Sequence, residues 1–307
     1  MNPNDLTIKF QRAMARNGLY STYFLFKWLP FWFINGISNT MIQIGYSLTK
    51  RHRNIARDSL NIAFEGKKSG GEIEQIVKKC FKNLGQSMIE MLYMMAHPDK
   101  LDEKVFVEGK SHLDNALKKG HGVVAVTAHF GNFPMMMLYF AQKGYDVSSI
   151  VRPARDKELE EFLLRKRGEL NVKTVYALPR QKCVTKSIST LRNNGVLFVP
   201  LDQNFGNGAG VYVDFFGQKA ATATGPVVFA LRTKAVILPM FIIRQPDNRH
   251  KIVIEAPIEV DSGSSENEDK AIVDNIAKIT QLIESYIRKY PHEWGWMHRR
   301  WKSRPKK

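Results

Sequence analysis

Short apolar segments alternate with helical ones over the last two thirds of the sequence, and this alternation is the strongest constraint on the fold. The run GVVAVTA (122–128) is apolar and β-branched, which is typical of a parallel strand buried on both faces. Further strands are predicted at 146–151, 172–177, 195–201, 235–243 and 251–256, and helices at 132–143, 159–170, 181–193, 224–233 and 268–289. The pattern predicts an α/β fold in which a mostly parallel central sheet carries helices on both faces.

The first hundred residues have a different pattern. Apolar side chains recur at steps of three and four over 72–96, and 54–66 has the character of a helix end, so this part is expected to be mostly helical. We therefore expect an N-terminal helical region at 1–100 and an α/β domain at 101–307. With 44% hydrophobic and 24% charged residues in 307, the chain can bury a sizeable core.

Residues 19–49 are rich in aromatic side chains, with two tryptophans and four phenylalanines between Phe24 and Phe33. Lys27 and Pro30 interrupt the apolar run, so it is a poor candidate for the roughly 20 apolar residues of a membrane-spanning helix. Aromatic rings beside a lysine suit the membrane interface. The segment is thus predicted to associate with a membrane; the alternative is a helical hairpin packed on the protein.

The chain is strongly basic, with 46 Lys and Arg against 29 Asp and Glu and a formal net charge of +17. Such charge favours an anionic partner: nucleic acid, a membrane, or an acidic substrate. Basic residues follow the aromatic segment at 50–57 and fill the C-terminus, HRRWKSRPKK. No nucleic-acid-binding motif accompanies them, so an anionic membrane is favoured over nucleic acid; a solvated charged surface is the alternative.

Two cysteines, Cys80 and Cys183, exclude a disulfide scaffold and a cysteine-rich zinc site. The eight histidines show no HExxH spacing. We therefore expect no metal. A GxSxG nucleophile elbow is also missing from the sequence, which disfavours a serine hydrolase.

Polar clusters follow two of the predicted strands: AHFGN (128–132) and DQNFGNGAG (202–210). In open α/β sheets, ligands bind outside the carboxyl ends of the strands. His129 is placed there as a candidate general base. Gly131 would allow close approach, and Asn132 would begin a helix whose amide groups could bind an oxyanion or phosphate. A purely structural histidine is the alternative.

Arg152 ends the second predicted strand, where its guanidinium could bind phosphate or polarise a thioester carbonyl. Arg155 could add to the same anion pocket. For both, a surface salt bridge is the alternative. The glycines between 206 and 210 predict a flexible loop, since a phosphate-binding P-loop would need GK[ST].

The run GVVAVTAHFGNF resembles the histidine motif of the lysophospholipid acyltransferase superfamily, and in particular of the bacterial lipid A late acyltransferases. Further matches in the same order are RDSLNIAF (57–64), IVRPARDKELEEFLLRKRGEL (150–170), VPLDQNFG (199–206), VYVDFFGQKAATATG (211–225) and PHEWGWMHRRWKSRP (291–305). The resemblance implies transfer of an acyl chain from an acyl carrier protein or coenzyme A thioester to a hydroxyl of a membrane lipid, such as a lipid A-type glycolipid. It implies no cofactor beyond that thioester, and a place on the cytoplasmic face of the inner membrane.

The same resemblance implies that Gly217, Thr222 and Thr224 lie in a segment facing the acyl chain or lipid. The threonines could instead cap the helix that follows them.

One position departs from the family pattern, which is His, four residues, then Asp or Glu. Here the sixth position is Pro134, whose side chain cannot orient an imidazole. Asp202 also ends a predicted parallel strand and is expected to supply the acid, with Asp156 and Glu158 less well placed. A catalytically impaired homologue that binds lipid or carrier protein is the alternative.

Overall fold

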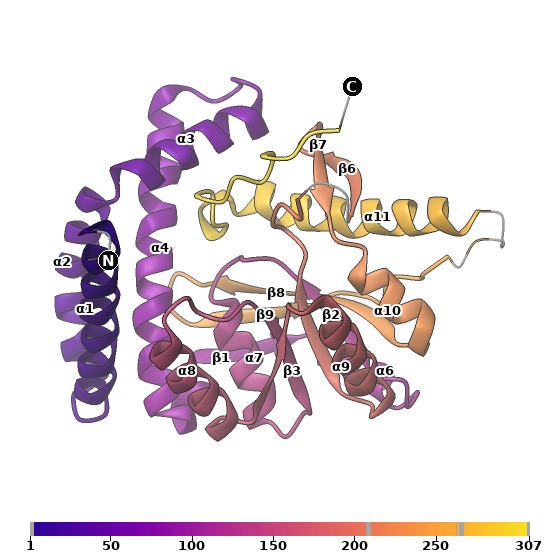
Figure 1. Cartoon of the computed structure of the whole chain (residues 1–307), viewed down its shortest axis with the longest axis horizontal. Helices are drawn as coiled ribbons and strands as arrows, with labels where there is room; N and C mark the ends of the chain where they lie inside the picture. The colour runs from indigo at the N-terminus through magenta and orange to yellow at the C-terminus, as the bar shows by residue number, and fades with distance from the viewer. Residues whose placement is uncertain (1–2, 207–209, 262, 264–266, 306–307) are drawn as a thin grey trace.

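A computed structural model describes residues 3–206, 210–261, 263 and 267–305, and it contains a seven-stranded sheet (Figure 1). The strands are β1 (Val105–Glu108), β2 (Val123–Thr127), β3 (Val147–Val151), β4 (Val172–Tyr176), β5 (Val196–Pro200), β8 (Val236–Arg244) and β9 (His250–Ile254). Their order is β1-β9-β8-β2-β5-β3-β4, and only the β8–β9 pair is antiparallel. The predicted mostly parallel sheet is confirmed.

Both faces of the sheet are covered, as predicted. Along β2, Val123 and Ala125 pack on one side and Val124 and Val126 on the other, so each face carries its own apolar core. Helices α6 (Lys110–Leu117) and α7 (Phe133–Gln142) contribute to one core, and α9 (Arg180–Arg192), α10 (Gly225–Thr233) and α11 (Glu268–Lys289) to the other. The remaining helix of this region, α8 (Lys157–Glu169), packs beside β4.

Several short elements were not anticipated. They are β1, α6, the four-residue helix α5 (Leu101–Lys104), two 3₁₀ turns (Pro98–Lys100 and Pro291–Glu293), and a hairpin of β6 (Val211–Phe215) and β7 (Gln218–Thr222) outside the main sheet. Of these, β1, α5 and the two 3₁₀ turns span only three or four residues, too few to show a clear apolar period.

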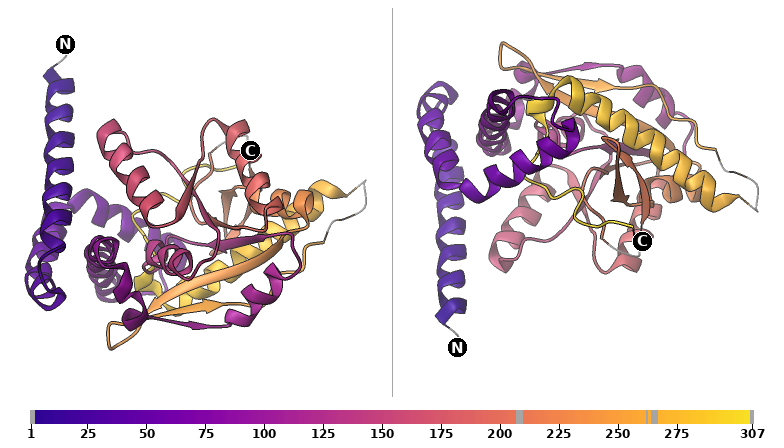
Figure 2. Two further views of the ribbon diagram at one scale, coloured as in Figure 1. Left: turned by 90° about the horizontal axis from the view of Figure 1, so that it is seen from below. Right: turned by 90° about the horizontal axis from the view of Figure 1, so that it is seen from above.

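The N-terminal region is helical, as expected, with α1 (Pro3–Phe26), α2 (Phe31–Leu48), α3 (Lys50–Phe64) and α4 (Gly70–Ala96). Ser69 and Glu72 form a capping box that begins α4. Helices α1 and α2 form a hairpin against the outer side of α4 (Figures 1 and 2). A Cβ on Gly85 of α4 would lie 2.7 Å from Ile42 of α2, so this packing needs a glycine there.

The α1–α2 hairpin leaves many large apolar side chains exposed. Trp28 and Trp32, at the tip, are 76% and 75% exposed. Other exposed apolar residues of the hairpin are Phe10, Met14, Phe24, Leu25, Phe33, Ile37, Met41, Ile44 and Leu48. Among the helices of the described residues, none is long and apolar enough to cross a membrane.

Candidate active site

His129 and Asp202 lie together at the carboxyl end of the sheet. Strands β2 and β5 are parallel neighbours, with Thr127 paired to Pro200, so the loops that leave them start side by side. Asp202 Oδ1 lies 2.8 Å from His129 Nδ1, and its Oδ2 accepts the His129 backbone N–H at 3.0 Å. The predicted proximity of these two residues is confirmed.

The other two candidate acids are engaged elsewhere. Asp156 caps α8 through the Leu159 amide and pairs with Arg16 of α1 at 3.0 Å. Glu158 contacts the same arginine at 3.2 Å. Neither carboxylate is the partner of His129.

Asp202 is a buried anion with three donors around it. In addition to the two His129 groups, the Trp294 indole N–H donates to Oδ2 at 2.7 Å. Burial alone would raise the pKa of Asp202, but the charge of His129 and the hydrogen bonds from His129 and Trp294 lower it well below its usual value. An ionised carboxylate only accepts hydrogen bonds, so His129 Nδ1 carries a proton, and in the neutral imidazole Nε2 keeps its lone pair.

His129 has the properties of a general base. Burial alone would lower its pKa, but the charge of Asp202 and the hydrogen bond to it outweigh burial and raise the pKa above its usual value. Its side chain is 28% exposed. The Gln203 amide nitrogen lies 3.0 Å from His129 Nε2. This unprotonated nitrogen is the atom that would accept a proton from a substrate.

A second histidine, His298, also lies in the site, which the sequence analysis did not anticipate. Its ring centroid is 5.3 Å from that of His129, and its Nε2 is 3.4 Å from the Gln203 amide nitrogen. Burial, and then the nearby His129, lower its pKa. The signal was the tryptophan-rich run around it: Trp294 and Trp296 are fully buried, so this segment is part of the core and not a solvated tail.

A cavity of about 820 Å³ opens beside His129. Its walls come from α4, α7, α8, α9, α10 and the ends of β3, β4 and β5, and they are mainly apolar, with Met91, Met95, Met137, Leu138 and Phe229 among them. Such a lining suits a flexible hydrocarbon chain, because methionine adapts its shape to what it packs against.

Two of the remaining predicted residues line this cavity: Arg152, at the end of β3, and Thr224, before α10. Pro134 lines it too, so an apolar ring stands where the family acid is expected. Thr224 precedes α10 without a side-chain cap. Arg155 is exposed and is not among the lining residues.

The structure contradicts a substrate-binding role for Thr222 and does not support one for Gly217. The Thr222 side chain is buried. Its hydroxyl donates a hydrogen bond to the Ala220 carbonyl and accepts one from the Arg300 guanidinium at 2.6 Å. Gly217 lies in the turn of the β6–β7 hairpin with φ +71°, away from the cavity lining. Gly208, in the predicted flexible loop, and Lys306 and Lys307 of the basic C-terminus lie outside the described residues.

Gly131 and Asn132 were also predicted to contact substrate, and neither lines the cavity. Gly131 has φ +56°, and a Cβ there would lie 2.0 Å from the Ile242 carbonyl oxygen, so glycine is required for chain packing. Asn132 is 1% exposed, and its amide donates to the Ser87 carbonyl and to Glu90, both on α4. Packing and hydrogen bonding account for both residues, and the buried Asn132 side chain does not line the cavity.

Neither cysteine is placed as a nucleophile. Cys80 is buried, donates to the Trp294 carbonyl, and burial raises its pKa to about 12. Cys183 lines the cavity, but burial raises its pKa as well. Within the described part of the chain, no group of three His, Cys, Asp or Glu side chains could hold a metal ion.

A histidine paired with a buried carboxylate lines an apolar cavity in an α/β fold, an arrangement that suits proton transfer beside an apolar ligand. The sequence model of the bacterial lipid A biosynthesis acyltransferases matches residues 19–303, and the chain belongs to this family of acyltransferases.

Characterised relatives support the same family. The chain is 26% identical to the lipid A biosynthesis palmitoleoyltransferase of Escherichia coli K12, over 97% of this chain and 96% of the relative. It is 24% identical to the lipid A biosynthesis lauroyltransferase of the same organism, over 90% and 88%. It is also 28% identical to the phosphatidylinositol mannoside acyltransferase of Mycobacterium tuberculosis H37Rv, over 43% and 42%.

Proposed function

We propose that this enzyme transfers a fatty acyl chain from a carrier thioester to a hydroxyl of a membrane lipid, with a lipid A-type glycolipid as the acceptor. The observation that carries the proposal is the His129–Asp202 pair, in which His129 lines the apolar cavity. The cavity would hold the acyl chain, and the free His129 Nε2 would face the acceptor hydroxyl.

The chemistry needs one base and no covalent intermediate on the enzyme. His129 Nε2 takes the proton of the acceptor hydroxyl, whose oxygen attacks the thioester carbonyl carbon. Asp202 stabilises the imidazolium that forms. The tetrahedral intermediate collapses, the carbon–sulfur bond breaks, and the thiolate leaves with the proton that His129 carried. Arg152, which lines the cavity, would stabilise the negative charge that develops on the carbonyl oxygen.

The acceptor hydroxyl would have to take the place of the Gln203 amide. Gln203 Nε2 lies 3.0 Å from His129 Nε2 and 3.4 Å from His298 Nε2, and Gln203 itself lines the cavity. A hydroxyl that occupied this position would replace the amide as the donor to His129. His298 would then border the acceptor.

Charge and the α1–α2 hairpin support the proposed donor and the proposed membrane location. An acyl carrier protein and coenzyme A are both anionic, as is a lipid A-type acceptor, and the chain carries a net charge of +17. We propose that the exposed aromatic tip at Trp28 and Trp32 lies in the cytoplasmic interface of the inner membrane, with basic residues contacting anionic headgroups.

The test supplies the purified protein, in mixed micelles, with a radiolabelled acyl donor and a lipid acceptor. Acyl carrier protein and coenzyme A donors are compared, with a lipid A precursor that has a free hydroxyl as acceptor. The expected result is acceptor-dependent transfer of label to the lipid, with one free thiol released per acyl group transferred. Thiol release without lipid labelling would show a thioesterase, and binding without either would show an inactive homologue; both contradict the proposal.

A further inference from the structure

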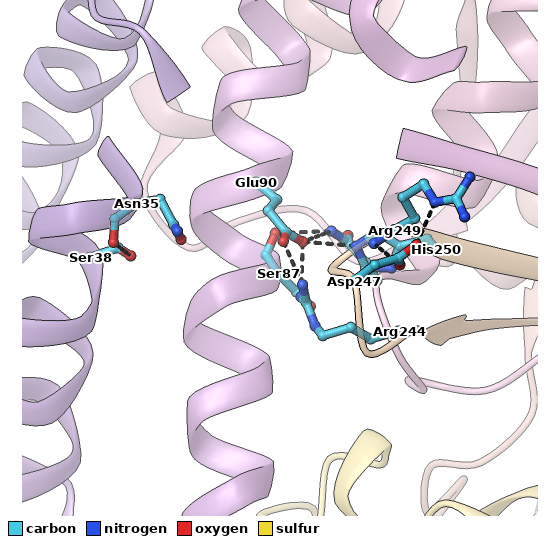
Figure 3. A network of polar contacts seen from close by, with 9 residues as sticks. Asn35, Ser38, Ser87, Glu90, Arg244, Asp247, Arg249 and His250 are labelled. Atoms are coloured by element: carbon cyan, nitrogen blue, oxygen red, sulfur yellow. Dashed lines mark hydrogen bonds and ion pairs between the residues drawn. The ribbon is translucent and has the colours of Figure 1, made fainter. Parts of the chain in front are cut away.

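A buried ionic cluster lies between α4 and the β8–β9 hairpin (Figure 3). Glu90 of α4 is its centre. Arg244 donates to the two carboxylate oxygens at 2.5 and 2.9 Å, and His250 Nε2 lies 3.0 Å from Oε2. Burial alone would raise the pKa of Glu90, but the hydrogen bonds from His250 and Arg244 lower it to about 2, so Glu90 is an anion fixed from several sides.

Asn132 connects this cluster to the turn that carries His129. The Asn132 amide donates to Glu90 Oε2 and to the Ser87 carbonyl, both at 3.3 Å. Asn132 directly precedes α7 and lies three residues after His129. On the opposite side, the same turn is fixed by the C-terminal segment: Gly131 N–H donates to the Glu293 carbonyl, and Gly295 N–H donates to the His129 carbonyl.

We infer that Asn132 and Glu90 are positioning residues for His129: they fix the turn 129–132 so that the imidazole stays on Asp202. This rests on the proposed function of His129 as the base. A buried ion cannot shift without losing its partners, so Glu90 is a rigid anchor. Asn132 is 1% exposed and does not line the cavity, so it can act only through the turn. Small displacements of a catalytic group have large kinetic costs, with a 1 Å error worth about 100-fold.

The variant Asn132→Ala separates positioning from substrate contact. No side-chain cap of α7 is lost, because Asn132 makes none, and Glu90 keeps Arg244 and His250. We expect kcat to fall by about 10-fold or more, with KM for donor and acceptor within about twofold. Should this variant fold poorly, Asn132→Ser, which keeps a polar side chain that is too short to reach Glu90, is expected to give the same kinetic result.

Asn275→Ala is the matched control. Asn275 is also fully buried, and its amide donates to the Asp261 and Ala271 carbonyls, both at 2.8 Å, within and beside α11. We expect it to lower Tm at least as much as Asn132→Ala while kcat stays at the wild-type value. An equal fall of kcat in both variants would overturn the inference, since general loosening of the fold would then explain it.

NMR titration of the His129 imidazole in the same proteins tests the inference without turnover. In the wild type the His129 pKa should lie above its usual value; Asn132→Ala should lower it, and Asn275→Ala should leave it unchanged. An unmoved titration with kcat within about twofold of wild type, or a rise in KM at constant kcat, would overturn the inference. If the wild type transfers no acyl chain but the titration moves in Asn132→Ala alone, the positioning role stands and the proposed function fails.

Discussion

Asp202 lies 73 residues beyond His129 in the sequence, and the two side chains meet at 2.8 Å through Oδ1 and Nδ1. The family motif has an acidic residue on the helix after the histidine, but this chain has Pro134 at that position. The carboxylate comes instead from Asp202, just beyond the end of the neighbouring strand β5. An acid in this position fixes the imidazole tautomer. The site therefore keeps its base, which disfavours an inactive homologue.

Asp202→Asn should lower kcat by more than about 10-fold, because the tautomer is no longer fixed. It should also lower stability by about 1–3 kcal/mol, because Asp202 accepts hydrogen bonds from the Trp294 indole and two His129 groups, and an amide leaves one of those donors unpaired. From sequence alone, little change in stability is expected; the donors around Asp202 change that expectation. Steady-state kinetics and urea unfolding check the two effects, and turnover near the wild-type level would contradict the role.

The rate should rise with pH through the His129 pKa, because only neutral imidazole can take a proton. Asp202 raises that pKa, so the acidic limb of kcat should have its midpoint above about 6.5, the usual value. Asp202→Asn should move this midpoint to lower pH while reducing the plateau. A midpoint that is the same in both proteins would mean that His129 does not produce the limb.

The same pair makes stability depend on pH. The raised His129 pKa stabilises the fold below about 6.5, and this contribution is lost as the pH rises through the folded-state value. The lowered Asp202 pKa stabilises the fold at pH values above 3.8, the usual pKa of this group. That contribution is lost as the pH falls from 3.8 through the folded-state pKa. The charged pair is therefore most stabilising between these limits.

Glu293 should destabilise the folded protein at neutral and alkaline pH. Burial raises its pKa to about 7, so the folded protein binds a proton that the unfolded chain releases near pH 4.5, and stability falls as the pH rises between these values. Glu293→Gln should be more stable than the wild type at pH 8 by on the order of 2–3 kcal/mol and nearly equal to it at pH 4.5. Urea unfolding at both pH values checks this, and a difference that does not change with pH would contradict it.

Trp28→Ala combined with Trp32→Ala should weaken binding to anionic vesicles by at least about 10-fold, since each indole would otherwise bury apolar area in the interface. Leu178→Ala is the control, because Leu178 is 67% exposed but lies outside the hairpin. High salt should release the wild type only partly, because screening weakens charge contacts and leaves apolar burial intact. Vesicle co-sedimentation measures both, and equal binding by the two variants would contradict the membrane role of the hairpin.

Most of the sheet could be predicted from the sequence because β2, β3, β4 and β5 are short runs rich in β-branched residues and separated by helices, whereas the four-residue β1 gives a weaker signal. It placed His129 and Asp202 at the same edge because parallel strands end together there. That they touch depends on β2 and β5 being neighbours, and the strand order, in which β5 lies between β2 and β3, is not contained in the periodicity of any one segment.

The residues that were predicted to contact substrate but do not line the cavity share one explanation. Thr222, Gly131 and Asn132 stand beside polar or glycine-rich motifs, but whether such a side chain faces a cavity or the interior depends on contacts from distant segments. Arg300 covers Thr222, Ile242 adjoins Gly131, and Glu90 covers Asn132. His298 was missed for the same reason, because the C-terminal segment folds back beside the sheet.

The most direct test of the account is acyl transfer by His129→Ala, compared with the wild type and with His121→Ala, which removes an exposed histidine. Transfer from a radiolabelled thioester to the lipid acceptor is measured at saturating donor, with circular dichroism to check that all three proteins are folded. We expect His129→Ala to lower kcat by about 10²–10⁴ and His121→Ala to leave it unchanged. Turnover by folded His129→Ala within about threefold of the wild type would contradict it.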